Sequence, residues 1–232
     1  MCYIGLDYDD NRESEFFMQR LDLDRVECLI FDLDGTLVDS EILSQQAYCD
    51  TVPDLDWDVH HLMTHFRGHQ FSRIVHALEE HVGRKLPEDY EALYRARVAE
   101  LFETQLKAYP HVTEAILGIK LPKCIASSGP LKKMRHSLGL TGLAQYFEPH
   151  LFSAYEISSW KPDPDLFLHA AKAMGFEPQA CLVIEDSAVG IQAAQAADMQ
   201  FLLHCPKGHD LPTGYDGPVL EDYSDFPLSV SQ

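Results

Sequence analysis

Basic residues are scarce in this sequence. Its 232 residues include 18 lysines and arginines against 37 aspartates and glutamates, so the formal net charge is −19 at pH 7. A nucleic-acid-binding surface of the usual kind is not expected, because phosphate backbones attract clusters of basic side chains. A small anionic substrate remains compatible with this charge, since a local positive pocket can override the field of the whole protein.

Long hydrophobic runs are also missing. No apolar run approaches the ~20 residues that a membrane-spanning helix needs, and the first residues lack the basic and apolar segments of a secretory signal. Hydrophobic residues make up 46% and charged residues 24% of the chain, a balance that is typical of a globular protein. We expect a cytoplasmic protein without a membrane partner, either a monomer or a weak homodimer.

No two of the six cysteines are spaced as C-x-x-C. Cys28, Cys124 and Cys181 each stand at the start of an apolar run, which favours buried free thiols in a reducing cytoplasm over disulfides. A metal motif of the H-E-x-x-H kind is missing as well, although four histidines cluster. We interpret this cluster as a solvent-exposed helix face rather than a zinc site. It comprises His60, His61, His65 and His69.

The first half of the chain is predicted to hold one strand and otherwise helices. Residues 1–24 are acidic at their start and have no apolar period, so we assign them to an N-terminal extension. After an apolar run at 28–31, the N-cap pair Asp39-Ser40 predicts a helix from Glu41 onward. Apolar residues then recur every three or four positions in three stretches, which predicts further helices. These stretches are 57–66, 71–81 and 87–106.

Strands and helices alternate in the second half. Short apolar runs predict buried strands at 123–127, 150–153, 181–184 and 201–203, with helices between them. Such alternation is typical of a parallel sheet with crossover helices, in which ligands bind at the carboxyl ends of the strands. We expect an α/β fold with a Rossmann-like three-layer core around a mainly parallel sheet and an inserted helical domain. The core would comprise 25–40 and 108–232, and the insertion 41–107.

The strand at 28–31 ends in two carboxylates, Asp32 and Asp34. Side chains alternate along a strand, so both acids point the same way and repel each other unless a cation lies between them. Gly35 then lets the backbone turn, and Thr36 places a hydroxyl beside the acids. An acidic surface turn is the alternative interpretation of this stretch.

The strand at 123–127 ends in Ser127. Its hydroxyl, with the backbone N–H groups of Ser128 and Gly129 ahead of a helix, could bind a phosphate oxygen. The same residues also make a good turn, which is the alternative.

Lys161 precedes a predicted helix, and Pro162 and Pro164 fix the backbone after it. An ammonium beside Asp32 would keep that carboxylate ionised and neutralise a phosphoryl oxygen. A surface lysine in front of a helix is the ordinary alternative.

Glu185 and Asp186 end the strand at 181–184 and precede another helix. Mg²⁺ prefers oxygen ligands in octahedral geometry. Asp32, Asp186 and the main-chain carbonyl of Asp34 would supply such ligands, and Glu185 would assist directly or through water. The alternative is that Asp186 only caps the helix.

These groups occur in the order and spacing of a known superfamily. The stretch from Phe31 to Thr36 resembles the first signature of the haloacid dehalogenase superfamily, and the likeness spans residues 26–205. The resemblance implies that Asp32 is the nucleophile and Asp34 the general acid and base of a Mg²⁺-dependent phosphatase. Such an enzyme acts on a small phosphorylated metabolite through an aspartyl-phosphate intermediate.

The helical insertion directly after this signature resembles the cap of subclass I. The resemblance implies that the cap closes over the site, excludes bulk water and contacts the substrate. Within it, we expect Arg67 to reach an anionic group of the substrate. A solvated helix charge is the alternative for Arg67.

Four segments are similar to bacterial 6-phosphogluconate phosphatases, which implies a sugar phosphate or sugar-acid phosphate as substrate. The segments are 94–102, 133–138, 151–157 and 160–174. A β-phosphoglucomutase shares the core residues but usually has a histidine ten residues after the acid/base aspartate, where this chain has Ser44. Phosphoglycolate phosphatase and a catalytically silent module that binds phosphorylated metabolites are further alternatives. A dehalogenase is disfavoured, because it would lack the carboxylates for Mg²⁺.

Overall fold

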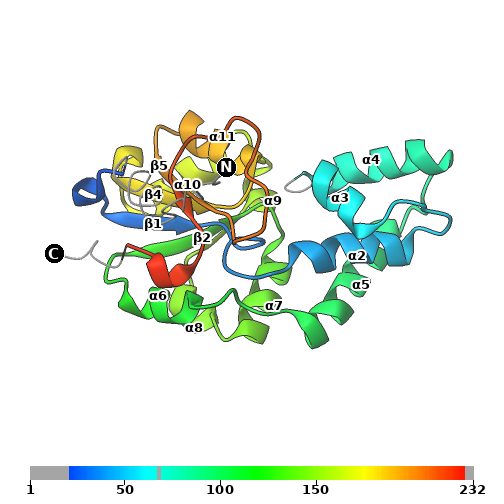
Figure 1. Cartoon of the computed structure of the whole chain (residues 1–232), viewed down its shortest axis with the longest axis horizontal. Helices are drawn as coiled ribbons and strands as arrows, with labels where there is room; N and C mark the ends of the chain where they lie inside the picture. The colour runs from blue at the N-terminus through cyan, green and yellow to red at the C-terminus, as the bar shows by residue number, and fades with distance from the viewer. Residues whose placement is uncertain (1–20, 67–68, 228–232) are drawn as a thin grey trace, which may run out of the picture.

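The computed structural model describes residues 21–66 and 69–227. A sheet with helices on both faces forms the core, and four helices form a second part beside it (Figure 1). Most of the predicted extension, residues 1–20, lies outside the described residues. Its last residues belong to the core, because Leu21 and Leu23 pack on the apolar cluster and the backbone N–H of Asp22 donates to the Gln200 side chain at 2.7 Å.

The sheet has six parallel strands in the order β3-β2-β1-β4-β5-β6. The strands are β1 Cys28–Phe31, β2 Lys123–Ser127, β3 Leu151–Ser153, β4 Cys181–Glu185, β5 Gln200–His204 and β6 Val219–Leu220. The first five lie on the predicted apolar runs, and the predicted parallel sheet is confirmed. β6 was not predicted, because two residues carry no detectable period.

Strand β1 lies in the middle of the sheet and is fully buried, as its unbroken apolar run predicts. Phe31 is in register with Ile125 of β2 and Ile184 of β4. Because all strands are parallel, the residues that follow these three positions lie at the same edge of the sheet. The register therefore brings Asp32, Ser127 and Glu185 to one edge.

Each face of the sheet packs on its own apolar cluster. One cluster joins Phe31 to residues of α6, α7 and α8, with the rings of Phe31 and Phe147 edge-to-face at 5.8 Å. The other joins Ile30 to residues of α10 and α11. This is the predicted three-layer core. Its helices are α6 Val112–Gly118, α7 Leu131–Thr141, α8 Ala144–Phe147, α9 Ala154–Ile157, α10 Asp165–Met174 and α11 Ala188–Ala196, with 3-10 turns at η1 Leu23–Arg25, η2 Pro178–Ala180 and η3 Tyr223–Asp225.

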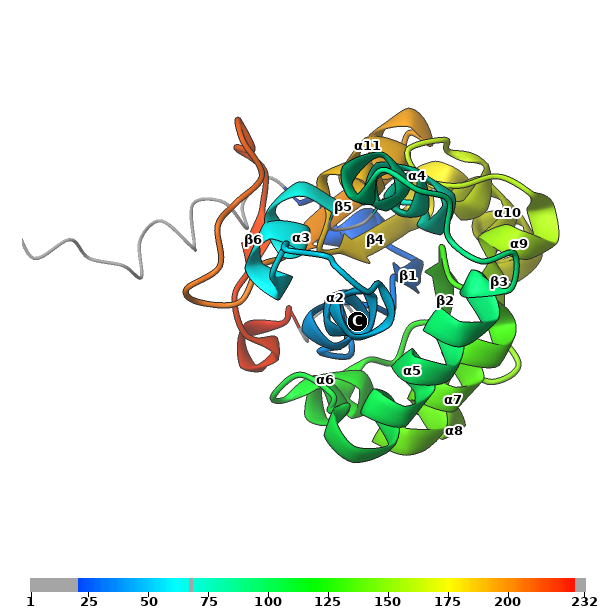
Figure 2. The ribbon, with the colours of Figure 1, turned by 90° about the vertical axis from the view of Figure 1, so that its right-hand side faces the viewer.

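The second part is the predicted helical cap. It lies over the carboxyl edge of the sheet. Figure 2 views the molecule from the side on which the cap lies and shows the cap helices in front of the strands. It has its own apolar cluster, which includes the buried side chains of Leu62, Leu78 and Phe102. The helices are α2 Glu41–Thr51, α3 Val59–Phe66, α4 Phe71–Val82 and α5 Tyr90–Gln105. The division into a core of 25–40 and 108–232 and a cap of 41–107 stays a prediction.

Two cap helices begin later than their apolar spacing predicts. Helix α5 begins at Tyr90, because Pro87 opens a turn in which its carbonyl accepts the N–H of Tyr90 at 3.0 Å. Helix α3 begins at Val59, and Trp57 instead stacks between the rings of His61 and His81, at centroid distances of 4.5 and 4.1 Å.

The interpretation of the four clustered histidines as one solvated helix face is correct for His60 and His65, which are exposed. It is wrong for His69. Helix α3 ends at Phe66, so His69 leaves that face and lines the cavity described below. The five described cysteines are free, as expected. Within residues 21–66 and 69–227, no helix combines the length and the apolar character of a membrane span.

Candidate active site

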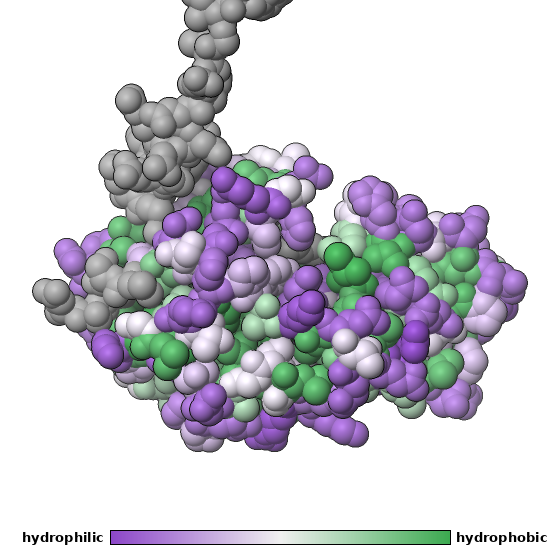
Figure 3. Space-filling view, turned by 60° about the horizontal axis from the view of Figure 1, so that its bottom comes forward, coloured by the Kyte–Doolittle hydropathy of each residue, from purple (hydrophilic) through white to green (hydrophobic). Residues whose placement is uncertain are grey.

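Four segments that are far apart in the sequence meet at the carboxyl edge of the sheet. Asp32 follows β1, Ser127 ends β2, Lys161 lies in the loop between α9 and α10, and Glu185 ends β4. All four residues line one cavity of about 980 Å³, which core and cap residues enclose together. The surface is hollowed between these two parts (Figure 3).

Lys161 joins two of these segments. Its side chain is 3% exposed, and its Nζ donates to the carboxylate of Asp32 and, at 2.7 Å, to Oε1 of Glu185. The ammonium also lies 4.9 Å from the ring centre of Phe167. Burial alone would lower the pKa of Lys161, but the two carboxylates outweigh it and raise the pKa above its usual value. The predicted contact between Lys161 and Asp32 is therefore present.

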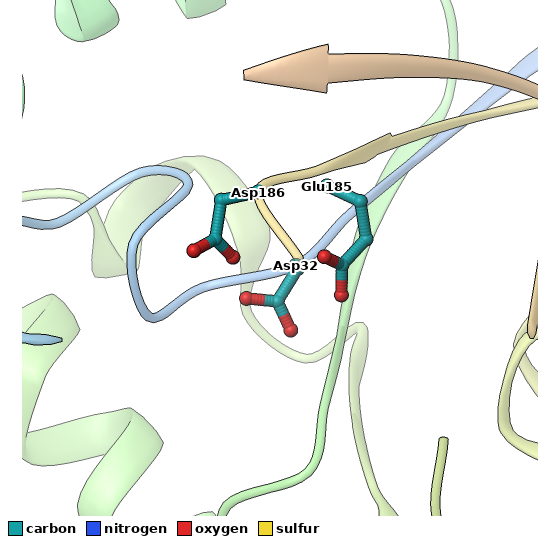
Figure 4. Close-up of side chains that lie close together, drawn as sticks. All are labelled: Asp32, Glu185 and Asp186. Carbon is teal, nitrogen blue, oxygen red and sulfur yellow. The ribbon is translucent and has the colours of Figure 1, made fainter. Parts of the chain in front are cut away.

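The carboxylates of Asp32, Glu185 and Asp186 converge on one point (Figure 4), and one oxygen of each lies within 4.8 Å of the others. Burial raises the pKa of the Asp32 carboxyl well above its usual range. Lys161 opposes this shift, whereas Glu185 and Asp186 add to it.

This carboxylate cluster fits a divalent cation. When all three buried carboxylates are ionised, their negative charge exceeds the positive charge of the Lys161 ammonium, which is costly in a buried site. The donors are oxygens, the ligands that Mg²⁺ prefers. In the arrangement expected from the sequence, Asp32 and Asp186 would hold the ion together with the main-chain carbonyl of Asp34, and this ligand set stays a prediction.

Glu185 is held by the start of helix α11. Its Oε2 accepts from the backbone N–H of Ser187 at 2.7 Å and from the Ser187 hydroxyl at 2.9 Å, while Oε1 accepts from Lys161. Both oxygens thus already have donors, which favours a water-mediated contact with a metal. A Cβ on Gly190 would lie 1.9 Å from this carboxylate, so only glycine fits there. The N-cap residue of α11 is Ser187, so the alternative that Asp186 serves as the N-cap of this helix is wrong.

The loop after Asp32 brings Gly35 and Thr36 against Asp186. Gly35 has a φ of +80°, and a Cβ at this position would lie 2.3 Å from the Asp186 carboxylate. Glycine is therefore needed both for the backbone conformation and for the close approach. The Thr36 hydroxyl donates to Oδ1 of Asp186 at 3.4 Å.

Asp34 lies beside the carboxylate cluster and has two partners that the sequence did not reveal. Lys133 of α7 places its Nζ 2.8 Å from Oδ1 of Asp34, and the Ser40 hydroxyl donates to the same oxygen at 2.6 Å. Burial alone would raise the pKa of the Asp34 carboxyl, but the Lys133 ammonium and these hydrogen bonds hold it below its usual range. The sequence does indicate a basic residue near the site, since Lys133 lies in the first turn of the helix that follows Ser127. It does not show whether Lys132 or Lys133 reaches Asp34, because the two lysines are adjacent.

Ser127, Ser128 and Gly129 line the same cavity. The backbone N–H of Gly129 donates to the Ser127 hydroxyl at 3.0 Å, and the Gly129 carbonyl accepts from the hydroxyl of Ser153 at 2.7 Å. The turn interpretation is therefore correct. Phosphate binding by these residues stays a prediction, which their position beside the cavity allows.

The cap side of the cavity contains residues that the sequence analysis missed. Arg95 of α5 donates from Nη2 to the Tyr155 hydroxyl at 2.8 Å and from Nε to Glu91 at 2.8 Å. This contact joins the cap to the core, because Tyr155 belongs to α9. Arg67, the predicted cap residue, lies outside the described residues.

The model of the haloacid dehalogenase-like hydrolase family matches residues 26–198. The chain belongs to this family, as its signature predicts. It is therefore an enzyme of the hydrolase class, and its curated relatives identify it as a phosphoric monoester hydrolase.

Two of these relatives come from Escherichia coli K12. The chain is 36% identical over 193 residues to 6-phosphogluconate phosphatase, covering 82% of this chain and 87% of the relative. It is 30% identical over 181 residues to hexitol phosphatase B, covering 75% and 81%. Among solved structures, a haloacid dehalogenase-like protein of unknown function from Agrobacterium tumefaciens aligns with a TM-score of 0.75 at 28% identity, covering 88% of this chain and 97% of that one.

Proposed function

We propose that this enzyme is a Mg²⁺-dependent phosphatase of small phosphorylated sugars and sugar acids, with 6-phosphogluconate as its preferred substrate. The observation that carries the proposal is the buried cluster of Asp32, Glu185, Asp186 and Lys161 at the floor of a cavity of about 980 Å³. The similarity to 6-phosphogluconate phosphatase and hexitol phosphatase B supports the substrate class. We place the reaction in the cytoplasm.

In the proposed reaction, a carboxylate oxygen of Asp32 attacks phosphorus, and the bond from phosphorus to the substrate alcohol breaks. Asp34 gives a proton to the departing alcohol. It then takes a proton from the water that hydrolyses the aspartyl-phosphate. When bound, Mg²⁺ would neutralise charge on the nucleophile and on the phosphate. Ser127 and Lys161 would bind the phosphate oxygens.

The partners of Asp34 fit the second of these steps. A carboxyl whose pKa is held low by Lys133 is ionised, and an ionised carboxylate can accept the proton of water. In the first step the same group has to carry a proton. The contact with Lys133 therefore has to loosen when the substrate phosphate enters.

Polar atoms on the cap side of the cavity support a polyhydroxylated substrate. Ser44 Oγ, Gln45 Oε1 and His69 Nδ1 are buried, line the cavity and have no hydrogen-bond partner in the part of the chain that the structure describes. Buried polar groups without partners are costly. Hydroxyl groups of a sugar would satisfy all three.

A phosphate-release screen tests this proposal. The substrates are 6-phosphogluconate, glucose 6-phosphate, a hexitol phosphate, β-glucose 1-phosphate and phosphoglycolate, each with Mg²⁺ and with a chelator. We expect the highest kcat/KM with 6-phosphogluconate and the loss of release under chelation. Conversion of β-glucose 1-phosphate to glucose 6-phosphate would identify a mutase instead. No release from any substrate would favour a module that only binds.

Arg95 is our candidate for binding the carboxylate of the sugar acid. Its guanidinium lines the cavity and stacks over Phe71 and Tyr155, at 5.6 Å from each ring centre. A hydrogen bond to a charged group contributes about 1.5–3 kcal/mol, which corresponds to roughly 10- to 100-fold in binding. Arg95→Gln is therefore expected to raise the KM for 6-phosphogluconate roughly tenfold or more and to change the KM for glucose 6-phosphate much less.

Tyr155→Phe is the matched control, because it removes the hydroxyl that Arg95 bonds and leaves the charge in place. If Arg95 only held the cap to the core, both variants would weaken the binding of both substrates to the same degree. If Arg95→Gln raised the KM for 6-phosphogluconate and the KM for glucose 6-phosphate by the same factor, the assignment of Arg95 to the substrate carboxylate would be contradicted.

A further inference from the structure

Two side chains from the C-terminal third of the sequence donate hydrogen bonds to the turn that carries Asp34. The carbonyl of Gly35 accepts from Nδ1 of His204 at 2.9 Å, and the carbonyl of Thr36 accepts from the hydroxyl of Tyr223 at 3.1 Å. Both donors are 1% exposed. They follow these carbonyls by 169 and 187 positions in the sequence. Two consecutive carbonyls of one loop are thus fixed by remote side chains.

The donors are themselves packed into a row of rings. His204 lies 4.6 Å from Tyr109 and 5.0 Å from Tyr223, measured between ring centres. Tyr223 stacks on Phe226, whose ring lies 6.1 Å from that of Phe31 in the strand before the nucleophile. The segment that carries Tyr223, red in Figure 1, packs on helix α6. These ring contacts pack around the two donors, while the hydrogen bonds themselves come from His204 and Tyr223 alone.

The position of this loop matters for the proposed chemistry. Asp34 directly precedes Gly35, and the loop contacts Asp186 through the Thr36 hydroxyl. A shift of the loop would therefore displace the acid/base carboxyl relative to the departing alcohol, and a general acid works only within hydrogen-bond reach of its target. His204 and Tyr223 both lie beyond residues 26–198, the range that the family model matches.

We infer that His204 and Tyr223 are positioning residues, which place the Asp34 carboxyl for proton transfer by holding the carbonyls of Gly35 and Thr36. The C-terminal segment is thereby part of the catalytic apparatus of this enzyme. This inference rests on the proposed phosphatase function and on the role of Asp34 within it.

The test compares a substrate whose departing group needs a proton with one whose group does not. Tyr223→Phe keeps the ring and removes the hydroxyl. It is expected to lower kcat/KM roughly tenfold for 6-phosphogluconate, because a misplaced acid loses part of its effect, and to leave kcat/KM for p-nitrophenyl phosphate within about twofold. His204→Leu, which removes the other donor, is expected to have the same selective effect.

Phe226→Leu is the packing control. It loosens the row of rings and leaves both hydrogen bonds, so it is expected to lower the unfolding temperature without changing the ratio of the two kcat/KM values. An unchanged ratio in both Tyr223→Phe and His204→Leu, with wild-type enzyme active on both substrates, would overturn the positioning role alone. Wild-type enzyme that hydrolyses neither substrate would overturn the phosphatase proposal, and this inference with it.

Discussion

Asp32→Asn is expected to abolish phosphate release while the protein stays folded. The amide has nearly the shape of the carboxylate, but it cannot attack phosphorus. Removal of a nucleophile typically costs several orders of magnitude in kcat, here roughly 10⁴-fold or more. Lys161 keeps Glu185 as a partner in the variant, so the buried ammonium is not left without an anion. Phosphate release with Mg²⁺ and circular dichroism of the same samples measure the two parts of the expectation.

Asp39→Asn is the matched control for this variant. Asp39 lies seven positions further along the same segment, and its side chain is exposed rather than buried in the carboxylate cluster. Turnover close to that of the wild type is expected for Asp39→Asn. Turnover in Asp32→Asn that matched this control would remove the nucleophile assignment.

Lys161→Met is expected to destabilise the metal-free protein strongly and to remove most of the activity. Without the ammonium, the carboxylates of Asp32 and Glu185 lose the charge-assisted hydrogen bonds that they accept from Lys161, and both stay buried. Breaking a buried ion pair by removing one partner typically costs 3–5 kcal/mol, so a loss of about 3 kcal/mol in the free energy of unfolding is expected.

The effect of Mg²⁺ on stability is a second test of this prediction. Because the surplus negative charge is larger in Lys161→Met, added Mg²⁺ should stabilise the variant more than it stabilises the wild type. Urea unfolding with and without Mg²⁺ measures both effects. Lys172→Met, at an exposed position of α10, is the control and should change neither. A Lys161→Met protein as stable and as active as the wild type would contradict the ion-pair arrangement.

The core of the site could be predicted from sequence because a parallel sheet imposes it. Strands β1, β2 and β4 are neighbours and run the same way, so the polar residues that follow their apolar runs have to meet at one edge. The local sequence alone predicted a buried strand at 28–31 with Asp32 and Asp34 at its end. The helical period likewise predicted the cap, because α2–α5 bury one face each in a cluster of their own.

The remaining features depend on tertiary contacts that leave no local pattern. Tyr223 and His204 reach the loop of Asp34 across more than half the chain, and β6 is too short to show a period. Lys133 was hidden because its neighbour Lys132 has the same charge, and only the orientation of α7 decides which of the two reaches Asp34. His69 was misassigned because the end of α3 at Phe66 breaks the helix face on which the histidines were placed.

In the proposed mechanism, Asp32 carries the phosphoryl group during turnover. The most direct measurement uses Asp34→Ala, which lacks the base for the second step and should accumulate the intermediate. After a brief reaction with Mg²⁺ and p-nitrophenyl phosphate, whose departing group needs no proton from Asp34, an acid quench and mass spectrometry of the peptides should find one phosphoryl group on Asp32. Phosphate bound to any other residue, or continued release of phosphate with no modified peptide, would contradict the account.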